Sequence, residues 1–574
     1  MTAAHHPHDD GDGDGDREKG MTIPSSSTED TLVASSPSPS GDELPTPPLS
    51  NPQTGPRNSN VMQEEAALTL VSFEEGDKAN PHNWSTTRKA IIVLTGVILC
   101  VNSTMGSTLT ANMFPYLEKQ FNLPPAGPQS VLAASVYLIG FMSGPLISAP
   151  LSESHGRRPV LVIGFVLFVF AVLGSGLSPT WECFLVMRFL TGTFGSPPNS
   201  VVGGVIADLF ADELVRGRVM MIWSAATVVG PVSGPIISGF VSPVGGWRWT
   251  FWRVFFSAPF VNRIALLIAV VSAGFVFALP ETLASKILQR KAARLNRLEG
   301  YRVFIAPADL NRRSFWVSMK TTLSRPLRLL CREMLLSLTC IYMAFVYAIF
   351  YMLVKIFPYI FEGVYGFNPG MAGVLFSLMA IGTFIGCFAA LSYDKIAPTI
   401  TAKHPAKRPE YLRLPIACAG GPPFVISLLW LGWASSPKVP WAVPWLALLP
   451  YGFAYQLIFV AMINYVADAY EIYAASALAA CSMTRSIAGA LIPLATDKML
   501  SSLGIAWSCT VLAIISAGLG CVPFLFITYG ERIRAASHFS RSLKKKASPS
   551  SSSSSGCAVE AVGEEGLTRS LSAV

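Results

Sequence analysis

Apolar stretches of about twenty residues recur along the chain and are separated by short polar segments. A helix needs roughly 20 residues to cross the hydrocarbon core of a bilayer, where backbone groups must pair within their own segment. Stretches of this kind lie at residues 90–111, 129–150, 159–177, 183–206, 218–241, 258–279, 334–357, 371–391, 413–433, 441–465, 473–495 and 505–527. The pattern predicts an all-α integral membrane protein with twelve transmembrane helices.

The composition favours a membrane protein over a soluble one. Of the 574 residues, 51% are hydrophobic and only 14% are charged, whereas about a quarter of the residues in a soluble protein are charged. The net charge of +8 is concentrated in loops beside apolar stretches, where it sets topology, so we expect no nucleic-acid partner. The 10 cysteines form no CxxC pair, and we expect them to pack as small apolar residues without a metal site.

Charge and composition divide the chain into halves and tails. The first residues are rich in Ser, Pro and acids and cannot bury a core. Between Pro280 and Glu333 twelve Lys or Arg residues oppose four acids, which favours a cytoplasmic position. The expected parts are a disordered cytoplasmic tail at 1–88, a first six-helix half at 89–280, a basic cytoplasmic loop at 281–333, a second six-helix half at 334–528 and a cytoplasmic tail at 529–574.

The loop at 149–159, APLSESHGRRP, joins two of these stretches. Gly156 allows a tight turn where a side chain would clash. Arg157 and Arg158 cannot lose their charge and hold the loop on the cytoplasmic side. We expect Glu153 and the two arginines to bridge helix ends as a gating loop, with Asp208 or Asp212 as acidic partners; the alternative is a positive-inside loop without a mechanical role.

The fifth apolar stretch combines small residues with two prolines. Gly230, Gly234 and Gly239 let neighbouring backbones approach closely. Pro231 and Pro235 remove helical hydrogen bonds and permit a bend. The same pattern is also compatible with ordinary small-residue packing.

Several polar and aromatic residues lie at membrane depth. Arg188 is either a functional cation or an anchor that extends toward the interface. Lys355 either neutralises an anionic substrate or extends outward past Phe357. The remaining candidates for a substrate cavity, each with interhelical packing as its alternative, are Asn102, Tyr347, Tyr351 and Asn464.

Three segments carry a resemblance to a known family. The loop at 149–159 resembles the loop between spans two and three of the major facilitator superfamily, although Glu153 replaces the usual Asp. Residues 188–192 fit its Arg-x-x-x-Gly pattern. Residues 230–239 resemble its antiporter motif, with Ser238 in place of one Gly. Further pieces, among them Pro280-Glu281-Thr282, look like the fungal twelve-span drug:proton antiporters.

The resemblance implies two six-helix halves around a central site, the major facilitator fold. It gives the fifth span the role of a pivot and a seal against leak, and it gives Arg188 a part in proton coupling. The other coupling candidates are Asp468, Glu471 and Arg485. Because the chain has no phosphate-binding Gly-x-x-x-x-Gly-Lys-Ser/Thr motif, we expect no nucleotide or other cofactor, and a proton gradient as the energy source.

The function expected from these features is proton-coupled export of small organic molecules, either drugs or a dedicated secondary metabolite such as an organic acid or a glycolipid. A polyamine or vacuolar transporter of the same family is the alternative. A membrane-embedded acyltransferase and a non-transporting sensor represent other classes, but no catalytic constellation is visible, so we expect no enzyme. The expected form is a monomer in the plasma membrane, with both termini cytoplasmic and the vacuolar membrane as the alternative site.

Overall fold

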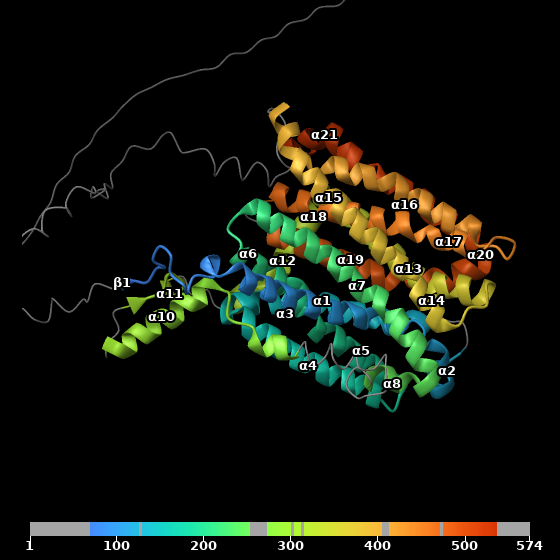
Figure 1. The fold of residues 1–574 in the computed structure, drawn as a ribbon, viewed down its shortest axis with the longest axis horizontal. Helices are drawn as coiled ribbons and strands as arrows, with labels where there is room; N and C mark the ends of the chain where they lie inside the picture. The colour runs from blue at the N-terminus through green and yellow to red at the C-terminus, as the bar shows by residue number, and fades with distance from the viewer. Residues whose placement is uncertain are drawn as a thin grey trace, which may run out of the picture. The chain divides into compact units, whose positions relative to one another are not determined.

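Long apolar helices dominate the structure, a computed structural model that describes residues 69–124, 129–252, 273–299, 304–310, 315–403, 412–470 and 474–536. The helices of the first half run close to parallel or antiparallel to one another (Figure 1). Their bounds are α1 (Thr86–Thr108), α2 (Phe114–Phe121), α3 (Gln129–His155), α4 (Arg157–Leu177), α5 (Trp181–Gly195), α6 (Pro197–Leu209), α7 (Glu213–Gly245) and α8 (Trp247–Trp252).

The second half repeats this arrangement with its own set of long helices. Their bounds are α13 (Met334–Pro358), η2 (Tyr359–Val364), α14 (Pro369–Leu375), α15 (Ser377–Lys403), α16 (Leu414–Ala434), α17 (Ala442–Leu446), α18 (Leu448–Tyr470), α19 (Ala474–Leu491), η5 (Ile492–Ala495), α20 (Thr496–Gly520) and α21 (Val522–Ala536). The backbone leaves helical geometry within α20 at Gly504, where φ is +73°. Gly504 therefore separates the eleventh expected span from the twelfth.

The described residues contain nine helical segments that are long and apolar enough to cross a membrane. One of them, Ser476–Gly530, has 55 residues, enough for two crossings. The fourth expected span is divided between α5 and α6, because Pro197 and Pro198 start a new helix there. The sixth, at 258–279, lies largely outside the described residues. The chain is a multi-pass membrane protein, and the number of twelve spans stays a prediction.

The two halves pack together along two seams. Helix α3 of the first half contacts α19, and α7 contacts α14 and α15 (Figure 1). The largest cluster of buried apolar side chains surrounds α13 and α18 and includes Leu138, Met221 and Val232 from the first half. The apolar core is therefore continuous across the junction of the halves.

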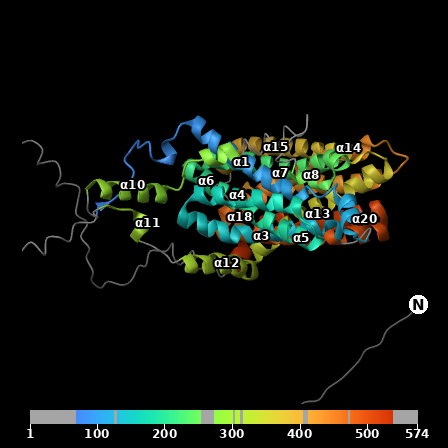
Figure 2. The ribbon, with the colours of Figure 1, turned by 90° about the horizontal axis from the view of Figure 1, so that it is seen from below.

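Part of the central segment lies outside the helical bundle, whereas its last helix packs against α3 and α19. The segment contains α10 (Ala284–Glu299), β2 (Phe304–Ile305), α11 (Pro307–Leu310) and α12 (Phe315–Arg332), and α10 and α11 lie beyond one end of the bundle (Figure 2). Strand β1 (Thr69–Leu70) pairs with β2 in parallel.

The disorder expected throughout 1–88 is wrong for residues 69–88. Besides the strand pair, Asp77 Oδ2 lies 3.0 Å from Lys291 Nζ of α10. The amide of Ala79 also donates to the Asp77 carboxylate, at 2.8 Å. The composition of residues 69–88 gave no sign of this structure, because their contacts are made with β2 and α10, more than 200 residues later in the chain.

Candidate functional site

The turn between α3 and α4 depends on a glycine. Gly156 has a φ of +104°, in a region that L-residues with a side chain rarely adopt. A Cβ at this position would lie 2.4 Å from Glu281 Oε2. Both the backbone conformation and the close approach of a carboxylate therefore require glycine here.

Glu281 organises this turn and was not among the predicted site residues. Its buried carboxylate accepts hydrogen bonds from the amides of Arg157 at 2.8 Å and Arg158 at 3.3 Å. It also accepts from Thr282 and Leu283, each at 3.1 Å. The only sequence signal was its place in the Pro-Glu-Thr segment of the family resemblance, because the turn lies 124 residues earlier in the chain.

In the described part of the chain, one of the two arginines in the turn forms the predicted ion pair. Arg157 Nε lies 3.2 Å from Asp208 Oδ2 at the end of α6, so Asp208 is its acidic partner. The other acid considered, Asp212, instead caps α7 by accepting from the amide of Leu214. Helices α4 and α6 are thereby joined at this end of the first half.

The other two loop residues form no ion pair among the described residues. Arg158 Nη2 donates to the carbonyl of Phe277 at 3.1 Å. Glu153 is exposed and forms no ion pair with any described residue. The loop's acid therefore does not join helix ends in this conformation, and Glu281 holds the turn instead.

A matching ion pair occurs in the second half. Arg413, which precedes α16, lies 2.8 Å from Asp394 and 3.4 Å from Asp468. Asp394 lies on α15. Asp468, a predicted coupling residue, is exposed near the end of α18, and Glu471 lies outside the described residues.

Hydroxyl groups of α1 take the place of the amide donors that prolines remove from α7. Pro231 and Pro235 have no amide hydrogen, which frees the carbonyls of Thr227 and Pro231 four residues earlier. Thr108 donates its hydroxyl to the Pro231 carbonyl at 2.8 Å. Thr104 Oγ1 lies 3.2 Å from the Thr227 carbonyl oxygen, although it is also close to a carbonyl of its own helix. The carbonyls that these prolines free in α7 thus find hydroxyl partners on its neighbour α1.

The same face of α7 reaches the second half. Asn112 Nδ2 lies 3.0 Å from the Pro235 carbonyl oxygen and 3.2 Å from that of Pro369, the first residue of α14. A Cβ on Gly239 would lie 2.4 Å from the same Pro369 oxygen, while Gly230 and Gly234 lie against α1. The small residues predicted to permit close packing therefore do so, within the first half and across to the second.

Arg188 is fully buried on α5, which contradicts the interfacial anchor. Its Nη2 donates to the Gly106 carbonyl at 2.7 Å and its Nε to the Ala133 carbonyl at 3.3 Å. The guanidinium carbon also lies 4.6 Å from the centre of the Tyr137 ring. Carbonyls and a ring, rather than an acid, balance this buried charge.

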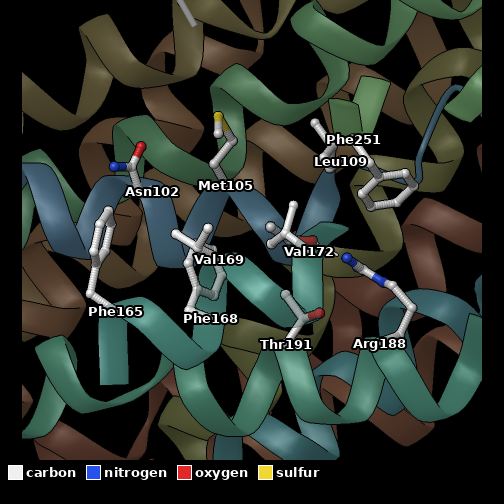
Figure 3. Close-up of a pocket in the computed structure, with 11 residues that line it drawn as sticks. Asn102, Met105, Leu109, Phe165, Phe168, Val169, Val172, Arg188, Thr191 and Phe251 are labelled. Atoms are coloured by element: carbon white, nitrogen blue, oxygen red, sulfur yellow. Dashed lines mark hydrogen bonds between the residues drawn. The ribbon is translucent and has the colours of Figure 1, made fainter. Parts of the chain in front are cut away.

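Arg188 also borders a pocket inside the first half, between α1, α4, α5 and α8 (Figure 3). Asn102 lines it from α1. Its cavity volume is about 30 Å³. The described chain breaks off at Trp252, directly after Phe251, so the lining is known for the described residues alone. We therefore assign no ligand to it.

Aromatic side chains of α13 and α18 meet the first half at the centre of the bundle. The hydroxyls of Tyr347 and Tyr351 lie 3.3 Å apart, and Tyr351 also pairs with Ser107 of α1 at 2.8 Å. Phe459 lies 6.3 Å from Tyr347 between ring centres. Two predicted cavity residues are thus brought together, whereas Asn464 lies further along α18 and is only half-buried.

Lys355 has a carboxylate partner within the chain. Its Nζ lies 3.5 Å from Asp497 Oδ1 and 5.3 Å from the centre of the Phe114 ring of α2. The carboxylate of Asp497 therefore neutralises Lys355 without a substrate anion. Through Phe114, Lys355 links the second half to α2 of the first. These contacts lie at the end of α13 that is far from the Gly156 turn.

Comparisons with known proteins agree with this architecture. The family model for the Major Facilitator Superfamily matches residues 97–493. The chain is 34% identical to the major facilitator superfamily multidrug transporter mdrA of Aspergillus fumigatus, over 81% of this chain and 74% of that protein. It is 36% identical to the MFS-type efflux pump MFS2 of Trichophyton rubrum, over 83% of this chain and 78% of the other.

Solved structures show the same fold. A crystal structure of a D-xylose–proton symporter superposes with a TM-score of 0.53 at 15% identity, covering 76% of this chain and 97% of the symporter. A partially occluded inward-open structure of the xylose transporter XylE from E. coli superposes with a TM-score of 0.52 at 16% identity, covering 78% of this chain and 98% of XylE. With the family model matched over more than half of its length, this chain belongs to the major facilitator superfamily.

Proposed function

We propose that this protein is a secondary transporter that exports small organic molecules by alternating access, driven by protons that move inward. The observation that carries the proposal is the antiporter-like face of α7, which contacts α14 of the other half through backbone and small residues. A junction of this kind can open and close without rebuilding large side-chain contacts. The names of the relatives, multidrug transporter and efflux pump, support the same direction of transport.

The central aromatic residues suit an amphipathic organic substrate. Binding sites for such molecules are mostly apolar with a few polar groups that fix orientation. Tyr347, Tyr351 and Ser107 supply hydroxyls next to Phe459 at the meeting point of the halves. We expect the substrate to bind there rather than in the pocket beside Arg188.

Proton coupling requires a group that changes its protonation state. Arginine does not lose its proton in proteins, so Arg188 and Arg485 would act on the proton affinity of their surroundings. Asp468 and Glu471 are the carboxylates we propose as carriers. The protein would need no cofactor, catalyse no covalent reaction, and act as a monomer in the plasma membrane.

Transport by purified protein in proteoliposomes tests the proposal. Fluorescent amphipathic dyes and organic acids should accumulate in vesicles with an acidic lumen. In such vesicles protons flow out through the transporter, and an antiporter moves its substrate in the opposite direction, into the lumen. Accumulation should stop when an ionophore collapses the pH gradient and should not require ATP. Protein-free vesicles provide the control. Accumulation that ignores the gradient would show that export is not proton-driven.

A further inference from the structure

Arg485 differs from the other cations at membrane depth. Its guanidinium carbon lies 5.1 Å from the centre of the Tyr347 ring and 5.4 Å from that of Phe459. Its Nε is buried and has no hydrogen-bond partner among the described residues. By contrast, Arg188 has two carbonyl acceptors and Lys355 has a carboxylate.

Two rings stabilise the charge of Arg485, and its buried Nε finds no acceptor among the described residues. Cation–π contact involves the face of the guanidinium, whereas its N–H groups point outward in the plane. A buried donor without a partner is unfavourable. Since Arg485 is half-buried on α19, its remaining donors are available to a small molecule at this position.

The neighbours of Arg485 place it where the halves meet. Gly489, one turn further along α19, lies against Tyr347 of α13 and Leu138 of α3. Tyr455 stacks on Phe459 with ring centres 4.4 Å apart. The cation therefore borders a cluster of aromatic rings that is shared between α13 and α18, in which the planes of Tyr347 and Phe459 are inclined by 52°.

We infer that Arg485 binds the carboxylate of an aromatic organic anion whose ring system lies beside the rings of Tyr347 and Phe459. The inference rests on the proposed transport function and names its substrate class. The planar fork of arginine matches the two oxygens of a carboxylate, and such paired hydrogen bonds are among the strongest in proteins. The anion would supply the acceptors that no described residue offers. The role first considered for Lys355 thereby moves to Arg485.

Binding of two matched probes to the purified protein in detergent tests this inference. The probes are 2-naphthoate and 2-naphthamide, which share a ring system but differ in charge. We expect wild-type protein to bind 2-naphthoate about tenfold or more tightly, the value of one hydrogen bond to a charged group. Arg485→Gln should remove that preference, and Arg485→Lys should reduce it several-fold because lysine keeps the charge but lacks the fork.

A second cation and a ring provide the matched controls. Lys355→Gln, which removes a cation from the same half, should leave the preference unchanged. Phe459→Leu should weaken both probes to a similar extent, because it removes the ring surface and keeps the charge. Gel filtration and thermal unfolding establish that each variant is folded.

Several outcomes would overturn the inference. They are equal binding of the two probes by wild type, a preference that survives in Arg485→Gln, and a preference lost in Lys355→Gln. If Arg485→Gln does not fold, Arg485→Lys decides, since an unchanged preference in that variant contradicts the predicted fork. Binding in detergent needs no gradient, so failure of proton-driven transport and failure of anion binding are separate results.

Discussion

Replacing Gly156 by alanine should destabilise the first half through two separate effects. The conformation at this residue, φ +104° and ψ 161°, costs a residue with a side chain about 1–3 kcal/mol. The new methyl group would also displace the Glu281 carboxylate, which lies 2.4 Å from the Cβ position. Losing one hydrogen bond to that charged acceptor costs about 1.5–3 kcal/mol. We therefore expect the free energy of unfolding to fall by about 4 kcal/mol.

Buried cysteines provide the assay. The thiols of Cys100, Cys340 and Cys509 are fully buried, so a thiol-reactive fluorophore reports their exposure as detergent-solubilised protein is heated. The control is Gly217→Ala in α7, where a Cβ would have no neighbour within 4 Å. Alanine in a helix is favoured over glycine by about 0.5–1 kcal/mol. Gly217→Ala should therefore unfold at or above the wild-type temperature, and Gly156→Ala clearly below it.

A double mutant separates the two effects. In a background of Glu281→Ala, the substitution Gly156→Ala should cost less, because the displaced carboxylate is already absent and only the backbone strain remains. Equal unfolding temperatures for Gly156→Ala and Gly217→Ala would refute the argument from conformation. Strict additivity in the double mutant would refute the argument from the carboxylate.

Three further changes test other contacts. Arg157→Ala should lower transport while expression and membrane insertion stay normal, as measured in proteoliposomes and by surface labelling. Thr108→Val should lower the stability of the folded protein by about 1–2 kcal/mol, because the carbonyl of Pro231 then has no donor; thermal unfolding measures this. The contact between Asp77 and Lys291 should weaken as pH falls. The Ala79 amide and Lys291 lower the pKa of Asp77 in the folded state. The stability that this carboxylate contributes is therefore present above the ordinary carboxyl pKa and disappears as pH falls through the lowered value. Hydrogen exchange of residues 69–83 at pH 7 and pH 3 measures the loss.

The features that sequence predicted well are local in the chain. Apolar length fixed the positions of α1, α3, α4 and α16 to within a few residues, because a membrane helix satisfies its backbone within its own segment. The glycine in APLSESHGRRP was identified for the same reason, since a turn between two long helices leaves little room. Both predictions required only neighbouring residues.

The features that sequence missed depend on residues far apart. The acid that holds the Gly156 turn is Glu281 rather than the nearby Glu153, and no spacing rule connects the two positions. The partner of Lys355 is Asp497, 142 positions later. A single sequence gives the type of each charged residue and its depth, but the pairing of charges depends on which helices become neighbours.

The pattern of hydrogen bonds also indicates which contacts move together during transport. Thr108 bonds to α7 within the first half, at a carbonyl that Pro235 has freed, so α1 and α7 stabilise each other's buried polar groups. Between α7 and α14, by contrast, Gly239 meets the Pro369 carbonyl through backbone contact, and Asn112 supplies a polar link. Separating α1 from α7 would leave a buried carbonyl unpaired, which is unfavourable in lipid. Opening the α7–α14 seam exposes fewer such groups, so we expect α1 and α7 to move as a unit and the halves to part at α14.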